Sequence, residues 1–147
     1  MDKTQLIEDM KTILASVFAL YLKAHNYHWN VTGPNFAQYH GFFGDFYDAL
    51  HDSVDDYAEH IRALGAFSPG SLKRFSEMTK VQDETSIPSP RFMFIRLNSD
   101  NETVLNLLRD ARNTAEQLKE GGVLNFLEER IDWHEKMNWQ LKAFEEN

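Results

Sequence analysis

Three of the six histidines in this 147-residue chain lie within sixteen residues, on both sides of a Gly-Pro break. They are His25, His28 and His40, and the break is Gly33-Pro34. Imidazole nitrogen combined with carboxylate oxygen is a ligand set that suits iron, zinc or manganese. The spacing therefore indicates a candidate metal site, provided that other parts of the chain supply carboxylates.

An acidic segment follows the histidines. It carries six acids in fifteen residues with no cation before Arg62: Asp45, Asp48, Asp52, Asp55, Asp56 and Glu59. On a helix these carboxylates span an arc of about 100°, opposite an apolar stripe. A solvated face is the ordinary interpretation of an acidic helix face. Six carboxylates on one face repel one another, however, and helix surfaces usually relieve this repulsion with interleaved cations. The pattern therefore favours a surface that faces metal ions.

The spacing of these groups decides how a site could form. Asp55 and Glu59 are four residues apart and can share one ion. His40 lies fifteen residues before Asp55, which is about 22 Å along one helix, so one chain cannot bring both to one ion. Either the groups are unrelated, or two chains build the site. Two copies of this helix crossing antiparallel near residues 48–50 would place His40 of one beside Asp55 and Glu59 of the other, twice, about a two-fold axis.

Apolar residues recur at three- and four-residue spacing and predict four long helices. We expect the first helix over residues 3–31 and the second from the end of the Gly-Pro turn to residue 64. The third is expected over residues 89–119 and the fourth over residues 123–144. Residues 65–90 read as a crossover with a short helix within 69–78. The polar run 98–102 is a potential break, and Gly121-Gly122 is expected to end the third long helix. These elements predict an all-α, ferritin-like four-helix bundle in a single domain, residues 1–147. The chain lacks Glu-x-x-His, so a di-iron centre inside the bundle is disfavoured.

Charge and composition narrow the function classes. The net charge of −8 disfavours binding to nucleic acid or acidic membranes, and neither end carries a basic tail. There are no cysteines, which excludes disulfides and thiolate metal sites and fits a reducing compartment. The N-terminus lacks the features of a signal peptide, and no apolar run reaches the roughly 20 residues of a membrane span. We therefore expect a cytoplasmic protein without a membrane partner.

Two stretches together resemble the Dps family of mini-ferritins, the DNA-binding proteins from starved cells. The first contains His28-Trp-Asn-Val-Thr-Gly-Pro-Asn-Phe, then His40, then Asp55-Asp-Tyr-Ala-Glu59-His-Ile-Arg-Ala-Leu-Gly65. The second is the C-terminal Asp132-Trp-His-Glu-Lys-Met-Asn-Trp-Gln-Leu-Lys-Ala-Phe144. The resemblance covers essentially the whole chain. The numbers of residues between His28, His40, Asp55 and Glu59 also match the spacing in the family.

The resemblance implies a specific function. Dps proteins are hollow dodecamers that bind Fe(II) between two-fold-related subunits, oxidise it with hydrogen peroxide in preference to dioxygen, and store ferric mineral inside. The resemblance implies that His28 and His40 of one subunit meet Asp55 and Glu59 of the other as catalytic metal ligands. Zinc or another divalent metal is an alternative occupant of this site. No metal role is assigned to His25, His51, His60 or His134. Trp29, beside His28, is either an apolar plug at the interface or a trap for a stray oxidising equivalent.

The chain departs from the family pattern at three places. Many members have an acid four residues after the second histidine, whereas this chain has Gly44, with Asp45 next to it. A second iron would then be absent or held by Asp45 or water. The loop that often lines the iron entry pores lacks its acids, which leaves Glu116 and Glu120 as candidates. The basic DNA-binding tail is also missing.

Two alternative functions remain open. One is a nucleoid-binding shell with little ferroxidase activity, and the other is a plain helical interaction protein.

Overall fold

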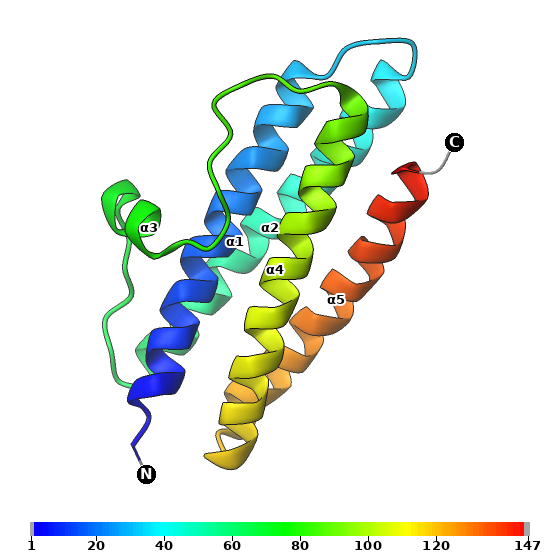
Figure 1. The fold of residues 1–147 in the computed structure, drawn as a ribbon. Coiled ribbons are helices and arrows are strands. Elements are labelled where there is room, and N and C mark those ends of the chain that lie inside the picture. Colours follow the sequence, from blue (N-terminus) through cyan, green and yellow to red (C-terminus); the bar gives the residue numbers. More distant parts are fainter. Residues whose placement is uncertain (1, 146–147) are drawn as a thin grey trace.

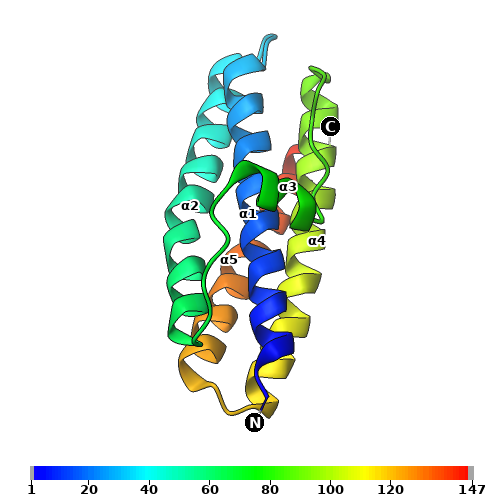
Figure 2. The same ribbon diagram turned by 90° about the vertical axis from the view of Figure 1, so that its left-hand side faces the viewer.

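A computed structural model describes residues 2–145, and these residues contain five helices. The helices are α1 (Thr4–Asn30), α2 (Phe36–Ala63), α3 (Leu72–Met78), α4 (Pro90–Gln117) and α5 (Gly121–Glu145). The four long helices lie side by side, and the short α3 lies across the outside of α1 (Figures 1 and 2). No strand occurs within the described range. The predicted all-α bundle with a helix in its crossover is confirmed.

The long helices form two antiparallel hairpins. α1 pairs with α2 through a short turn, and α4 pairs with α5 in the same way. The segment between α2 and α4 runs the length of the bundle, because α2 ends at the opposite end from the start of α4 (Figure 1). None of the helices between residues 2 and 145 is long and apolar enough to cross a lipid bilayer.

The core forms where the apolar stripes of the four long helices meet. Its largest fully buried side chains include Tyr27, Phe43, Phe46, Tyr57 and Phe94. Leu6, Met10, Ile13, Leu14 and Leu20 bury the predicted face of α1 completely. Burial of this apolar surface is the dominant stabilising contribution, at roughly 25 cal/mol per Å². The bundle thereby holds α1 and α2 in one fixed register, on which the candidate site depends.

Two long helices end in the same hydrogen-bond pattern. After α2, Gly65 donates its N–H to the carbonyl of Arg62 and Ala66 donates to Ile61, with Gly65 at φ 100°. After α4, Lys119 and Glu120 donate to Glu116 and Ala115, with Lys119 at φ 58°. This is the Schellman ending, which normally selects glycine at the left-handed position. The prediction that Gly121-Gly122 ends the helix was wrong: α4 ends at Gln117, Lys119 takes the left-handed position after it, and the glycines open α5.

The polar run at residues 98–102, a potential break in the sequence, does not interrupt α4. Asn101 is fully buried and donates its amide to the carbonyl of His134 at 2.9 Å. His134 is also fully buried, and its Nδ1 donates to Oδ1 of Asn101 at 2.6 Å. Burial lowers the pKa of His134 well below its usual value, and the nearby charge of Arg130 adds to the effect. The polar residue at the centre of the run therefore joins α4 to α5.

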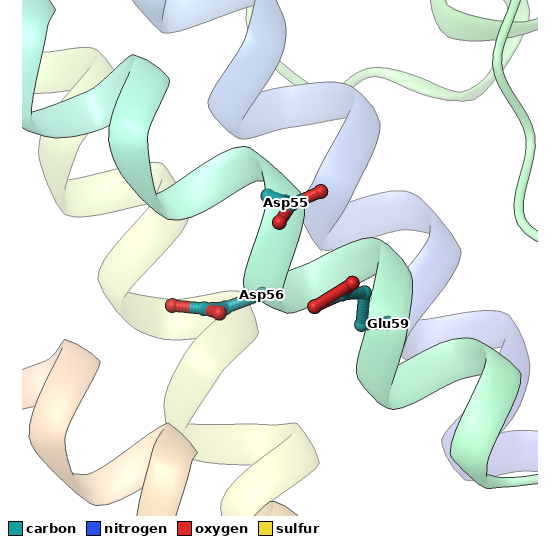
Figure 3. A group of neighbouring side chains, drawn as sticks. All are labelled: Asp55, Asp56 and Glu59. Atoms are coloured by element: carbon teal, nitrogen blue, oxygen red, sulfur yellow. The ribbon is translucent and has the colours of Figure 1, made fainter.

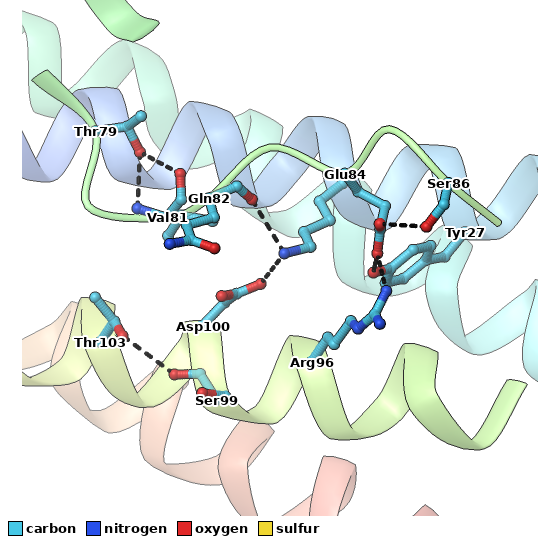
Figure 4. Close-up of polar contacts among 11 residues, drawn as sticks. Tyr27, Thr79, Val81, Gln82, Glu84, Ser86, Arg96, Ser99, Asp100 and Thr103 are labelled. Atoms are coloured by element: carbon cyan, nitrogen blue, oxygen red, sulfur yellow. Dashed lines mark hydrogen bonds and ion pairs between the residues drawn. The ribbon is translucent and has the colours of Figure 1, made fainter. Parts of the chain in front are cut away.

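Polar contacts fasten the crossover to the bundle (Figure 4). Glu84 accepts hydrogen bonds from Tyr27 at 2.6 Å, from Arg96 at 2.7 Å and from Ser86 at 3.0 Å. Partial burial alone would raise the pKa of Glu84, but these donors together lower it to about 2. The nearly buried Lys23 adds an ion pair with Asp100 at 2.8 Å and a bond to the carbonyl of Gln82. The crossover is thus fixed against α1 and α4 by charged groups.

Candidate metal centre

The Gly-Pro turn brings two of the predicted ligands together. His28 lies in the last turns of α1 and His40 in the second turn of α2, and their rings stack with centroids 3.7 Å apart. Both side chains are half-buried. Gly33 adopts φ 113°, a left-handed conformation in which glycine has no steric penalty, and the chain reverses there. The turn and the register of α1 against α2 therefore create the histidine pair.

Two reciprocal hydrogen bonds fix the orientation of this pair. Nδ1 of His28 lies 2.7 Å from the carbonyl oxygen of His40, and Nδ1 of His40 lies 2.7 Å from the carbonyl oxygen of His28. A carbonyl oxygen can only accept, so each Nδ1 must carry the proton. The tautomer set by these bonds has its lone pair on Nε2, the atom through which the ring can bind a metal. Metal-binding histidines commonly use such a bond from their other nitrogen to set tautomer and ring orientation.

The third histidine of the cluster packs among aromatic rings. His25 stacks on Tyr47 at 3.8 Å with the rings 8° from parallel, and it contacts the ring of Trp29 at 3.9 Å. Its Nδ1 lies 3.1 Å from the hydroxyl of Tyr21. Burial lowers the pKa of His25, and the charges of His28 and His51 lower it further. His25 thus packs among aromatic rings, and its ring centroid lies 6.1 Å from that of His28.

The predicted carboxylates form a second group on α2 (Figure 3). Asp55, Asp56 and Glu59 are exposed, and one carboxylate oxygen from each lies within 4.8 Å of the other two. Sequence reasoning paired Asp55 with Glu59 but gave Asp56 only a place in the acidic stripe. The spacing in the sequence could have shown that Asp56 joins this group, since residues at i, i+1 and i+4 lie on neighbouring parts of a helix surface. Three acids are therefore available to one cation at this point.

The two groups do not meet within one chain. No histidine belongs to the carboxylate group, and no carboxylate joins His28 and His40 within 4.8 Å among residues 2–145. In particular, Asp45 does not accompany the histidine pair, although the sequence leaves it open as a replacement for the acid missing at Gly44. A donor set of two nitrogens and at least two carboxylates suits Fe(II) or Zn(II). The chain carries both halves of that set at separate places on its surface.

The acidic stripe lies where the sequence predicts it. All six carboxylate residues from Asp45 to Glu59 are exposed, whereas Phe43, Phe46, Leu50 and Tyr57 on the opposite side of α2 are buried. A single face of one helix therefore presents six negative charges to its surroundings.

Comparison with known proteins places this geometry in a family. The family model described as ferritin-like domain matches residues 7–147. The DNA protection during starvation protein of Helicobacter pylori is 28% identical over 137 residues, which cover 92% of this chain and 95% of that protein.

Solved structures agree with this assignment. A Dps protein from Bacillus brevis superposes with a TM-score of 0.95 at 27% identity, over 99% of this chain and all of the other. Dps from Staphylococcus aureus gives a TM-score of 0.95 at 25% identity, with 99% and 98% of the two chains covered. Together with the bundle, its crossover helix and the His28–His40 pair beside the acidic helix face, these matches show that the chain belongs to the ferritin-like family, and within it to the Dps proteins.

Proposed function

We propose that this protein is a mini-ferritin that binds Fe(II) between two subunits, oxidises it with hydrogen peroxide and stores the ferric product inside a hollow dodecamer. The observation that carries the proposal is the division of the ligands. Within residues 2–145, no carboxylate completes a ligand group with His28 and His40, whose Nε2 atoms are left to bind a metal, and no histidine joins the carboxylates of Asp55 and Glu59. Each half completes the other only when a second copy of the chain is present.

The residues have separate roles in this proposal. The Nε2 atoms of His28 and His40 bind Fe(II) and set its position. Asp55 and Glu59 of the neighbouring subunit supply negative charge, which favours the ferric over the ferrous ion. Two ferrous ions give one electron each to one hydrogen peroxide, which also takes up two protons and becomes two water molecules, so hydroxyl radical is not released. Ferric ions then leave the site for the acidic face of α2, where several carboxylates can hold the first mineral.

The membership of the Dps family and the chemistry of the donor set support this proposal over a helical interaction protein. The alternative of a nucleoid-binding shell with little ferroxidase activity takes its support from the name of the Helicobacter pylori relative. The net charge of −8 and the exposed acids of α2 speak against it, because phosphate binding relies on cationic side chains.

The test is an anaerobic Fe(II) titration of the assembled protein, followed by a pulse of peroxide under a stopped-flow spectrophotometer. We expect saturable Fe(II) binding and fast oxidation. The variants His28→Ala and Asp55→Ala should slow oxidation strongly while the oligomer, checked by size-exclusion chromatography, stays intact. Glu8→Gln is a matched control, because Glu8 is an exposed acid of α1 outside the acidic face. Failure of the parent to bind Fe(II) saturably would overturn the proposal.

A further inference from the structure

The contact between α2 and α5 is built from large side chains. These two helices belong to different hairpins, and their backbones approach one another less closely than the backbones within either hairpin. Aromatic rings span the interval between them. Tyr57 meets Phe126 edge-on with the ring centroids 4.8 Å apart, and Phe46 stacks on Trp133 at 5.7 Å. The polar ends of side chains that reach into this contact are therefore enclosed between the two helices.

Three side chains in this contact have buried polar atoms with no hydrogen-bond partner among residues 2–145. These atoms are the hydroxyl oxygen of Tyr57, Nε2 of His134, and Nε and Nη2 of Arg130. Tyr57 and His134 are fully buried, and Arg130 is half-buried. A polar group that loses its hydration on burial destabilises the fold unless it gains a hydrogen bond, and such groups are bonded in most proteins to other protein atoms or to ordered water.

The three side chains are neighbours. Arg130 and His134 lie one turn apart on α5, and the His134 side chain leans toward that turn because helical side chains tilt toward the N-terminus. Burial raises the pKa of Tyr57, and the nearby charge of Arg130 lowers it. Burial lowers the pKa of His134, and the same charge lowers it further. Arg130 therefore lies close to both groups, although no direct hydrogen bond of good geometry joins it to either.

The hydrogen-bonding roles of these atoms are fixed by their other contacts. Nδ1 of His134 donates to Oδ1 of Asn101, so Nε2 carries the lone pair and can only accept. The Arg130 guanidinium lies against the ring of Trp133, with Cζ 4.8 Å from the ring centroid, and its N–H groups can only donate. The Tyr57 hydroxyl can do both. A molecule that bridges the three groups must accept from Arg130 and donate to His134.

Water meets this requirement and an anion does not. A water molecule accepts and donates, and buried waters typically make about three hydrogen bonds to groups that otherwise have no partner. A halide or a carboxylate could accept from Arg130, but it would present a negative charge to the lone pair of Nε2. Since burial keeps His134 neutral, this nitrogen cannot supply a proton to such an ion.

We propose that the core of each subunit binds one ordered water molecule between α2 and α5, held by Nε2 of His134, the hydroxyl of Tyr57 and an N–H of Arg130. The water links α2 to α5, which also meet through their aromatic side chains. Its site lies on the buried side of α2, opposite the exposed carboxylates, so it is independent of the proposed metal centre and of the proposed function.

A crystal structure of the assembled protein, from crystals soaked in sodium bromide, tests this inference. We expect one density peak without anomalous signal, about 2.7–3.2 Å from Nε2 of His134 and from at least one of the other two groups. An anomalous bromide peak at this place would show an anion site and overturn the proposal. A direct bond from Arg130 to Tyr57 or His134 with no peak between them would also overturn it.

Urea unfolding of the Tyr57→Phe variant supplies a second test in solution, at the same protein concentration as the parent. If the water bonds the hydroxyl, its removal should lower the unfolding midpoint. Removal of a buried hydroxyl that has no partner would leave the midpoint unchanged or raise it, because burying such a group is unfavourable. A midpoint equal to or above that of the parent would therefore contradict the bridge.

Tyr39→Phe is the matched control on the same helix. Tyr39 is half-buried, and its hydroxyl makes only a 3.4 Å contact with the Asn35 amide at the exposed start of α2. The midpoint of this variant should stay close to that of the parent. A fall in Tyr39→Phe as large as that in Tyr57→Phe would show that the loss is not specific to the buried hydroxyl, and it would overturn this line of support for the bridge.

Discussion

His28 and His40 each donate a hydrogen bond from Nδ1 to the backbone carbonyl of the other, and both distances are 2.7 Å. One of these carbonyls, that of His28, belongs to the last turn of α1, where helix carbonyls lack an intrahelical partner. His40 therefore stabilises the end of α1 and at the same time holds its own Nε2 free. The candidate site and the α1–α2 connection are stabilised by the same two bonds.

Mixed shells test whether two chains share one site. The His28→Ala/His40→Ala and Asp55→Ala/Glu59→Ala variants should each be inactive alone. After dissociation and joint reassembly, a mixed two-fold pair has one site with all four defects and one intact site. With random pairing, about half of the pairs are mixed, so peroxide-driven Fe(II) oxidation should return to roughly a quarter of the parent rate. No recovery in shells shown to contain both variants would contradict a site between subunits.

Glu84 should make the stability of the crossover depend on acid. Its pKa is lowered from 4.5 to about 2 by its three donors, so its contribution is fully present above pH 4.5 and is lost as pH falls toward 2. Glu84→Gln should therefore lower Tm at pH 7. The difference in Tm between parent and variant should shrink as the pH is lowered from about 4.5 to 2, and differential scanning calorimetry measures it. A difference that stays constant across this range would mean that the charge of Glu84 is not what stabilises the crossover.

Asn101→Ala should destabilise the bundle by about 1–3 kcal/mol, because it leaves Nδ1 of His134 buried without its partner and removes the amide bond from α4 to the carbonyl of His134. Urea unfolding monitored by circular dichroism provides the measurement. Asn106→Ala is the matched control on the same helix, since Asn106 is exposed and its loss should change the stability by less than about 0.5 kcal/mol. Equal effects of the two substitutions would argue against the α4–α5 link.

Lys119→Gly should stabilise the fold by about 1 kcal/mol, because Lys119 occupies a left-handed position at φ 58° where a Cβ is disfavoured. The same hydrogen-bond pattern after α2 already uses glycine at that position. The midpoint of urea unfolding should therefore rise in the variant. A fall in the midpoint would show that the lysine side chain contributes more than its backbone conformation costs.

The protein should not retain duplex DNA in a gel-shift assay near neutral pH, even at low salt, where phosphate-driven binding is strongest. The reasons are the net charge of −8 and the six exposed acids of α2. A stable shifted complex at physiological salt would contradict this prediction and favour the nucleoid-binding alternative.

The hydrophobic pattern was sufficient to predict the four long helices and the crossover. It failed where a local rule competed with tertiary contacts. The polar run at residues 98–102 was identified as a potential break, but within it Asn101 finds a buried partner on α5 for its amide. Lys119 was missed because glycine is the expected residue at a left-handed helix end and two glycines follow it.

The finer geometry of the site could not be predicted from spacing. The sequence places His28 and His40 on adjacent helices, but their reciprocal bonds depend on the rotation of α1 against α2 and on two side-chain rotamers. The close approach of the His28 ring to Gly44 depends on the same rotation, because only the packed helices bring the two residues together.

The turn between α1 and α2 is a place where occupancy of the centre can be read by proteolysis. Residues 32–38 are all exposed, yet His28 and His40 pin the chain on both sides of them. A protease must open this turn to cut it, and opening separates the two imidazoles. Any ion held by both rings therefore makes opening less favourable, by a free energy that rises with the logarithm of one plus the ratio of its concentration to its Kd. Cleavage near Gly33-Pro34 should slow as the centre fills, whether or not any electron is transferred.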